Sequence, residues 1–272
     1  MRLLSFLLLV YSVQLCIAQD AEDKVRITDE KTETGLIIYG FNDDMVPYTV
    51  EINVQQTNLK SNKKFPLTTV LPPQSSQVVI AALTAIMPDK GWSYGSQFTY
   101  YMGDHRAQHD DDFVYALPFD PGDKFIMSQG YNGAFSHAGK NAIDFTMPEG
   151  TKIRAARGGL VVTVKEDSNV GCPYRSCLEG ANKITIFHED GTFADYVHLQ
   201  KDGSIVSVGD RVKTGDLIGF SGATGFASGP HLHFEVFRPE RNENGYISIK
   251  TNFNYAPGKK GMLKEGEFYE AF

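Results

Sequence analysis

The sequence is poor in cysteine and tryptophan and carries no excess of positive charge. It has three cysteines and one tryptophan in 272 residues, with a formal net charge of -7. An acidic balance without a basic cluster gives no support for binding to nucleic acid or to an anionic membrane surface. The apolar content of 42% is ordinary for a soluble protein with a real core, and the length allows two domains.

Long apolar runs are also scarce, and the one near the start is too short for a permanent transmembrane anchor. Residues 1–18 read as a signal peptide, with Arg2 as the positive region and Leu3 to Val10 as the apolar run. Cleavage before Gln19 predicts export to a periplasm or to the outside of the cell. The alternative is a lipoprotein acylated at Cys16, although Leu15 is a poor fit to the small residue that such processing prefers.

Two cysteines remain in the mature chain, Cys172 and Cys177, with four residues between them. In an exported protein this spacing predicts a disulfide that staples a small loop. A zinc knuckle is the weaker alternative, because no second cysteine pair completes it.

Residues 19–104 are predicted to form an antiparallel β-sandwich, immunoglobulin-like in character, after a loose polar leader that reaches about Thr34. Short β-rich runs separated by turn-forming residues carry this prediction. The runs are Gly35 to Tyr39, Tyr48 to Gln55, Lys64 to Leu71, Gln77 to Leu83 and Gln97 to Met102. Nothing in this domain looks catalytic, which leaves four roles open: a spacer, a substrate-orienting module, an autoinhibitory prefix or a plain structural domain.

A charged stretch, residues 105–114, follows and contains His105, His109 and three successive aspartates. Such a cluster can hold a metal weakly, but we interpret it as a solvated linker between domains. The second domain is then residues 115–272.

Amphipathic helical periodicity is missing from the second domain, so we predict that it is all β. Residues 183–198 form a hairpin around the turn at Asp190 and Gly191, and residues 142–146 form a strand. Residues 229–236 predict a further strand, in which His231 and His233 face the same side about 6 to 7 Å apart. One imidazole of such a pair can bind a metal while the other handles a proton.

Residues 129–239, the core of the second domain, resemble the LytM or lysostaphin-type zinc metallopeptidase domain of family M23. The match rests on six motifs in order, and it covers none of the first domain. They are His137 with Asp144, Gly158 to Val161, Tyr196 to Leu199, Gly209 to Gly215, Ser221 to Gly225 and Gly229 to Phe234. Six residues separate His137 from Asp144, whereas many relatives have three.

The resemblance implies an antiparallel β-sheet peptidase with one Zn²⁺ per chain, held by His137, Asp144 and His233. His198 and His231 match the two histidines that do not bind the metal. They are expected to take a proton from water and to stabilise the tetrahedral oxyanion, in an order that the sequence leaves open.

Tyr131 matches a tyrosine that faces the site in some relatives, and its predicted role is to hydrogen-bond the oxyanion. The implied substrate is the peptide part of bacterial peptidoglycan, either a stem-peptide crosslink or a glycine-rich bridge. The glycine-rich segment 221–229 is predicted to line the substrate groove.

Two readings of a different class remain beside the peptidase. A non-catalytic module with the same fold would bind the cell wall or activate a partner hydrolase, but such proteins lose metal ligands and here all five site positions are filled. A lipoyl-like carrier would leave the histidine-rich site unexplained.

The remaining histidines receive no role: His188 is expected to be solvent-exposed, and His105 and His109 belong to the linker.

Overall fold

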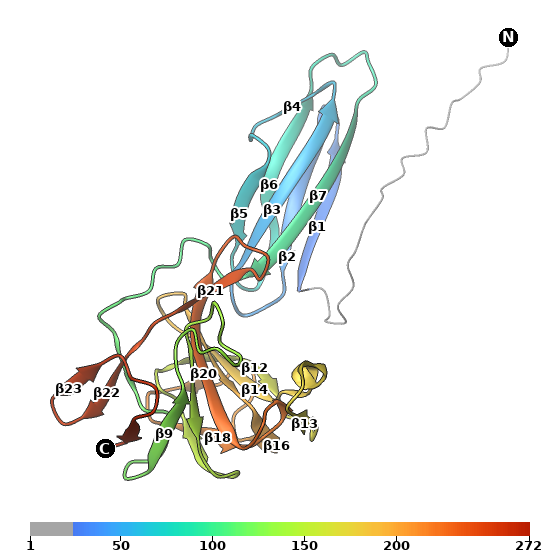
Figure 1. Ribbon diagram of the computed structural model, residues 1–272. Coiled ribbons are helices and arrows are strands. Elements are labelled where there is room, and N and C mark those ends of the chain that lie inside the picture. Colours follow the sequence, from blue (N-terminus) through green and yellow to red (C-terminus); the bar gives the residue numbers. More distant parts are fainter. Residues whose placement is uncertain (1–23) are drawn as a thin grey trace. The chain divides into compact units, whose positions relative to one another are not determined.

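The computed structural model describes residues 24–272, which divide into two compact units, one ending at Tyr101 and one running from Met102 to Phe272. Within residues 24–272, the regular elements are β-strands apart from one short 3-10 helix, as Figure 1 shows, which confirms the predicted all-β class. The predicted signal peptide, with Cys16, lies outside the described residues. Among residues 24–272, no helix has the length and apolar character to cross a membrane.

The first unit contains two antiparallel sheets. One has the strand order β1-β2-β6-β4 and the other β5-β3-β7. The strands are β1 (Val25–Thr32), β2 (Gly35–Asn42), β3 (Tyr48–Thr57), β4 (Leu59–Ser61), β5 (Leu67–Leu71), β6 (Ser75–Ala85) and β7 (Ser93–Met102).

The core of the first unit is shared by the two sheets. Leu36 and Ile38 of β2 are buried with Val50 and Ile52 of β3, and each pair is two residues apart. Because alternate residues of a strand face opposite sides, this spacing directs one face of each sheet inward. The unit is therefore a two-sheet sandwich, while its immunoglobulin-like character stays a prediction.

The predicted loose leader up to Thr34 is wrong for the described residues that follow Lys24. Val25–Thr32 form β1, which pairs with β2 along its whole length, from Val25 opposite Asn42 to Thr32 opposite Gly35. β1 is an edge strand and only Val25 is fully buried, so most of its side chains are polar and exposed. The alternation of apolar and polar residues that predicts a half-buried strand is therefore nearly absent from β1.

The second unit is organised around a large sheet with the order β17-β12-β14-β15-β20-β10-β9-β24, to which β21 adds on β20. Its strands are β9 (Lys124–Gln129), β10 (Ala142–Thr146), β12 (Gly159–Lys165), β14 (Lys183–Phe187), β15 (Phe193–Val197), β17 (Arg211–Val212), β20 (His231–Pro239), β21 (Tyr246–Ile249) and β24 (Phe268–Glu270). The smaller pieces are β8 (Val114–Ala116), β11 (Lys152–Arg154), β13 (Gly171–Cys172), β16 (Leu199–Ser204), β18 (Leu217–Ser221), β19 (Gly225–Phe226), β22 (Asn252–Ala256), β23 (Lys259–Gly261) and the 3-10 helix η1 (Arg175–Gly180).

One face of the large sheet is apolar. Leu232 and Phe234 of β20 lie in the core with Ile143 and Phe145 of β10. The period of two then places His231 and His233 on the opposite face of β20. The predicted hairpin is also present, since β14 and β15 pair from Lys183 opposite Val197 to Phe187 opposite Phe193.

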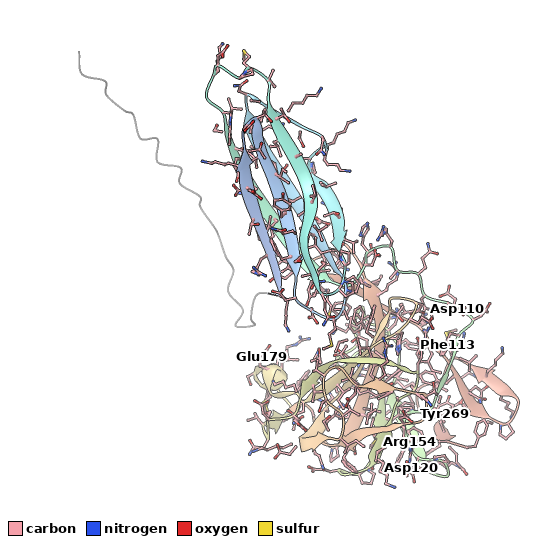
Figure 2. All side chains as sticks on the ribbon, turned by 180° about the vertical axis from the view of Figure 1, so that it is seen from behind. Asp110, Phe113, Asp120, Arg154, Glu179 and Tyr269 are labelled. Carbon is pink, nitrogen blue, oxygen red and sulfur yellow. A yellow bond between two sulfur atoms is a disulfide. The ribbon has the colours of Figure 1, made fainter. Side chains whose placement is uncertain are left out.

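Ion pairs, hydrogen bonds and a disulfide fix the short segments of this unit. Arg154 of β11 forms an ion pair with Asp120 (Figure 2) and donates a hydrogen bond to the carbonyl oxygen of Gly215 at 2.7 Å. The predicted disulfide joins Cys172 and Cys177, whose Cα atoms are 5.9 Å apart. It staples η1 to β13, which pairs in parallel with β19.

The predicted linker, residues 105–114, belongs to the second unit. The ring of His109 lies 3.2 Å from the Tyr115 hydroxyl, and its side chain is only 4% exposed. Tyr115 is itself completely buried, so this end of the stretch packs onto the second unit and His109 is not solvated.

The expectation of an exposed His188 is wrong, because the residue is completely buried. Its Nδ1 donates to the carbonyl oxygen of Gly158 at 2.9 Å, and its ring meets Tyr115 edge-on. Burial lowers its pKa to about 4, so it is neutral in the folded protein near neutral pH. The turn at Asp190 that suggested exposure is covered on this side by Arg157, whose guanidinium pairs with Asp190 at 2.7 Å.

Candidate metal and catalytic site

The register of three neighbouring strands builds the site. Asp144 of β10 lies directly opposite His233 of β20 on one side and opposite Gln129 of β9 on the other. Directly paired residues share a face of the sheet, so these three side chains form one row. His137 reaches the row from the loop between β9 and β10.

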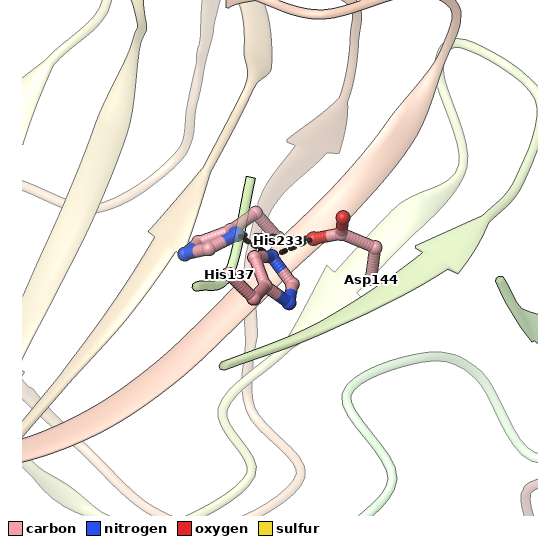
Figure 3. Close-up of side chains that lie close together, drawn as sticks. All are labelled: His137, Asp144 and His233. Atoms are coloured by element: carbon pink, nitrogen blue, oxygen red, sulfur yellow. Dashed lines mark hydrogen bonds and ion pairs between the residues drawn. The ribbon is translucent and has the colours of Figure 1, made fainter. Parts of the chain in front are cut away.

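Three donor atoms converge at this row (Figure 3). His137 Nε2 lies 3.1 Å from His233 Nδ1 and 3.2 Å from Asp144 Oδ1, and His233 Nδ1 lies 3.0 Å from Asp144 Oδ1. Three ligands placed tetrahedrally around zinc, at bonds of about 2.0–2.1 Å, stand about 3.3–3.4 Å apart. The donor triangle therefore already has nearly the size that zinc requires.

The chemistry of the donors also fits a borderline divalent ion. Two imidazole nitrogens and one carboxylate oxygen are accepted ligands for zinc, and three protein ligands leave a fourth position open. Among the described residues, His137, Asp144 and His233 are the group whose geometry could hold a metal ion. His137 and Asp144 are buried, which distinguishes the site from a cluster of surface acids.

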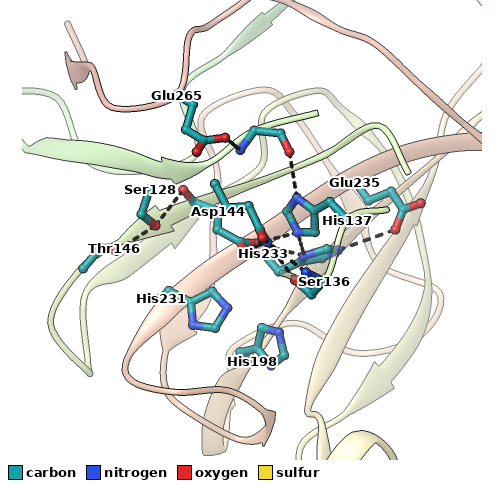
Figure 4. Close-up of polar contacts among 12 residues, drawn as sticks. Ser128, Ser136, His137, Asp144, Thr146, His198, His231, His233, Glu235 and Glu265 are labelled. Carbon is teal, nitrogen blue, oxygen red and sulfur yellow. Dashed lines mark hydrogen bonds and ion pairs between the residues drawn. The ribbon is translucent and has the colours of Figure 1, made fainter. Parts of the chain in front are cut away.

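Each ligand is oriented by a contact to its other polar atom (Figure 4). His137 Nδ1 donates to the carbonyl oxygen of Gly130 at 3.0 Å, and His233 Nε2 lies 3.5 Å from Glu235 Oε2. Gln129 Nε2 donates to Asp144 Oδ2 at 2.9 Å. These contacts leave His137 Nε2, His233 Nδ1 and Asp144 Oδ1 to face the metal position, which is how second partners orient metal ligands.

In the metal-free chain, the surroundings favour an ionised Asp144 next to a protonated His233. Burial alone would raise the pKa of Asp144, but hydrogen bonds from His137 and His233 outweigh it and hold that pKa far below its usual range. Burial would likewise lower the pKa of His233, yet Asp144 and Glu235 together raise it to about 9. A metal ion binding here would therefore displace a proton from His233.

His198 and His231 lie beside the metal site, with ring centroids 4.4 Å apart. The centroid of His198 is 5.9 Å from that of His233. His198 Nδ1 donates to the carbonyl oxygen of Thr224 at 2.6 Å, and His231 Nδ1 donates to that of Gly229 at 2.8 Å. A neutral imidazole that donates through Nδ1 keeps a lone pair on Nε2, so both rings can accept a proton there.

The backbone and the burial of His198 are unusual. The residue follows β15 with φ of +67°, the left-handed region that non-glycine residues seldom occupy and that occurs at functional sites. Burial lowers its pKa to about 3, so its imidazole is neutral at physiological pH. A neutral ring is the form that a general base needs.

The Tyr131 hydroxyl is hydrogen-bonded to Thr251, and so it is not free for the oxyanion contact predicted for it. Its hydroxyl donates to the carbonyl oxygen of Thr251 at 3.0 Å and accepts from the Thr251 N–H at 3.1 Å. Burial raises the pKa of the Tyr131 hydroxyl, although the hydrogen bonds with Thr251 act in the opposite direction. Stabilising an oxyanion would require the hydroxyl to leave Thr251, so that role stays a prediction.

Three further residues serve this site and were not predicted from the sequence: Gln129, Thr224 and Glu235. For Glu235 a signal was present, because it follows His233 by two residues in a strand and must share its face. The contacts of Gln129 and Thr224 depend on strand pairing and loop closure, for which the spacing of the residues gives no signal.

The profile of Peptidase family M23 matches residues 138–245, a range that begins one residue after His137 and includes Asp144, His198, His231 and His233. The chain is 41% identical over 155 residues to the glycyl-glycine endopeptidase ALE-1 of Staphylococcus capitis, covering 51% of this chain and 39% of the relative. It is 30% identical over 205 residues to the peptidoglycan DD-endopeptidase ShyA of Vibrio cholerae, covering 70% and 44%.

Among solved structures, the catalytic domain of lysostaphin from Staphylococcus simulans aligns with a TM-score of 0.35 and 28% identity, over 46% of this chain and 87% of that domain. The chain spans less than half the length of the two curated relatives. The matched range and the residues within it identify the second unit as a peptidase domain of family M23.

Proposed function

We propose that the chain is an exported, zinc-dependent metalloendopeptidase that hydrolyses peptide bonds of peptidoglycan. The observation that carries the proposal is the convergence of three donor atoms, from His137, Asp144 and His233, next to the paired imidazoles of His198 and His231. A purely structural metal site would have no use for His198 and His231, whose Nε2 lone pairs are left free.

The proposed substrate rests on the relatives, which are named as a glycyl-glycine endopeptidase and a peptidoglycan DD-endopeptidase. Export rests on the leader sequence and on the Cys172–Cys177 disulfide, since disulfides persist in oxidising compartments. One zinc ion per chain follows from the single donor triangle among the described residues.

His137, Asp144 and His233 would hold the zinc ion, and the remaining steps fall to side chains beside it. When bound, zinc polarises the scissile carbonyl and lowers the pKa of the attacking water. The Nε2 lone pair of His198 or His231 accepts the proton of that water, and the resulting imidazolium returns a proton to the leaving amine as the C–N bond breaks. The other imidazole stabilises the oxyanion as an imidazolium, whose Nε2–H donates to the oxyanion while its Nδ1–H stays on the backbone carbonyl.

The test is a digestion of purified peptidoglycan by the zinc-loaded chain, with released fragments identified by mass spectrometry and Asp144→Ala run beside it. New peptide termini that are absent from the Asp144→Ala digest would establish a zinc endopeptidase and identify the bond. Stoichiometric zinc without fragments from several wall types would instead point to a latent enzyme, a non-wall peptide substrate or a binding role.

A further inference from the structure

Gln129 occupies the end of the row that carries the metal ligands. It is the last residue of β9, and it lies opposite Asp144, which in turn lies opposite His233. The pairing of β9 with β10 shifts register just after Asp144. Gln129 is thus placed beside a ligand by strand pairing, and the residue is only 9% exposed.

The amide of Gln129 uses its donors and its acceptor on two partners. Its nitrogen donates to Asp144 Oδ2 at 2.9 Å and to Ser136 Oγ at 2.7 Å, while its oxygen accepts from the Ser136 backbone N–H at 3.2 Å. A backbone N–H can only donate and an ionised carboxylate can only accept, so the orientation of the amide is determined.

These contacts connect two metal ligands. Asp144 is one ligand, and Ser136 directly precedes His137, the ligand that comes from a loop. Gly130, the residue that follows β9, accepts from His137 Nδ1 at 3.0 Å, so Gln129 and Gly130 together contact both ligand segments. The Gln129 side chain therefore bonds to both ends of the segment that separates the two ligands, at Ser136 and at Asp144.

The packing around Gln129 leaves room for this arrangement. A Cβ atom on Gly133 would lie 3.0 Å from Gln129 Cδ and only 2.5 Å from Gln129 Cγ, and the second distance is shorter than Cβ contacts in proteins allow. The absence of a side chain at Gly133 therefore admits the Gln129 stem. The Gly130 N–H donates to Glu265 Oε2 at 3.0 Å, which anchors the end of β9 from the C-terminal segment.

We propose that Gln129 is a positioning residue of the metal site, which sets the distance between Asp144 and His137 before the metal binds. The proposal rests on the zinc site put forward above. With Asp144 Oδ2 held by the amide, only Oδ1 faces the two imidazoles, and the His137 loop cannot move without breaking contacts to the same side chain.

The test is the zinc affinity of the full chain carrying Gln129→Met, measured by competition with a chromogenic chelator. Methionine has nearly the same length but makes none of the three hydrogen bonds. We expect zinc binding about 10- to 100-fold weaker, the loss typical when an outer partner of a ligand is removed. Unfolding of the metal-free chain, measured in excess chelator, separates this loss from a general loss of stability.

The matched control is Gln56→Met, which removes a single glutamine hydrogen bond to the Leu59 carbonyl in the first unit. If Gln129→Met binds zinc no more weakly than Gln56→Met, the proposal is wrong. Should the methionine variant fail to fold, Gln129→Asn is measured instead. It keeps the amide but is one methylene too short to reach both partners, so unchanged affinity would overturn the proposal equally.

The outcome for the natural chain separates this inference from the proposed function. A natural chain that binds no zinc refutes both. A natural chain that binds zinc and cleaves its substrate, beside a Gln129→Met chain of equal affinity, refutes only the role of Gln129.

Discussion

The two units bury different kinds of side chain. Among the described residues of the first unit, the buried polar side chains are Asn42 and Thr49, whereas the second unit buries many, including Asp144, His198 and Glu235. The Asn42 amide serves local structure, since it donates to the Val46 carbonyl at 2.8 Å. Burying a polar group is costly unless it is paired, so a cluster of such groups marks a place where function sustains the cost.

The comparison is tested most strongly at the metal ligands. Asp144→Ala or His233→Ala should lose both zinc and hydrolysis, because either change leaves only two donors at the site. Metal content of the purified variant and release of peptide fragments measure the two losses. Unchanged metal content would show that the ligand assignment is wrong.

A core change in the first unit provides the contrast. Ile52→Ala should lower the stability of that unit by about 2–5 kcal/mol, because Ile52 is 1% exposed in its core. We expect zinc to stay bound at one ion per chain. Loss of zinc in this variant would break the distinction between a structural and a functional unit.

The next effect concerns the two histidines that do not bind the metal. His198→Ala and His231→Ala should keep zinc and lower kcat about 10²- to 10⁴-fold, the usual contribution of a general acid or base. Steady-state kinetics beside a metal assay give both values. Full activity in either variant would contradict the role assigned to that residue.

A smaller effect, on the pH dependence of stability, should come from His188, which is buried and has no role at the metal site. Its pKa falls from 6.5 to about 4 on folding, mainly because of burial. The charges of Arg157 and His109 lower it further, whereas the hydrogen bond to Gly158 and the charge of Asp190 raise it. The unfolded chain therefore takes up a proton first as the pH falls. The stability of the second unit should drop by about 3 kcal/mol between pH 6.5 and pH 4, and none of this loss occurs above pH 6.5.

Denaturant unfolding at a series of pH values measures this dependence. His188→Gln can still donate to the Gly158 carbonyl but does not titrate, so its stability should fall less over the same pH interval. An identical pH dependence in the natural and variant chains would show that the loss arises elsewhere.

The smallest effect is expected for Tyr131→Phe. It leaves the buried N–H of Thr251 without its acceptor, which should cost about 1–3 kcal/mol of stability. Because the hydroxyl is engaged with Thr251, kcat should change little. A large fall in kcat with stability unchanged would favour the oxyanion role predicted from the sequence.

The sequence was most informative where one strand carries its own signal. The alternation from His231 to Val236 identifies both the strand and its two faces, and the Asp190–Gly191 turn identifies the hairpin. These patterns are local, so they survive without knowledge of the partner strand. The donor set of the metal site followed from a family resemblance, which supplied the pairing that local patterns lack.

Predictions failed where the environment comes from elsewhere in the chain. His188 lies next to a polar turn but is covered by Tyr115 and Arg157, both distant in sequence. β1 carries few apolar residues because an edge strand needs few, so its pairing with β2 determines its structure. Gln129 becomes a partner of Asp144 only through the register of β9 on β10.

The register of β20 against β10 has a consequence for how activity arises during folding. In a strand, a slip by one residue exchanges the two faces, so His231 and His233 would point into the core and Leu232 and Phe234 would point to solvent. A mispaired sheet would therefore contain no metal site at all. The metal site therefore forms only when β20 pairs with β10 in the native register. Until this pairing is complete, the chain has no site for hydrolysis.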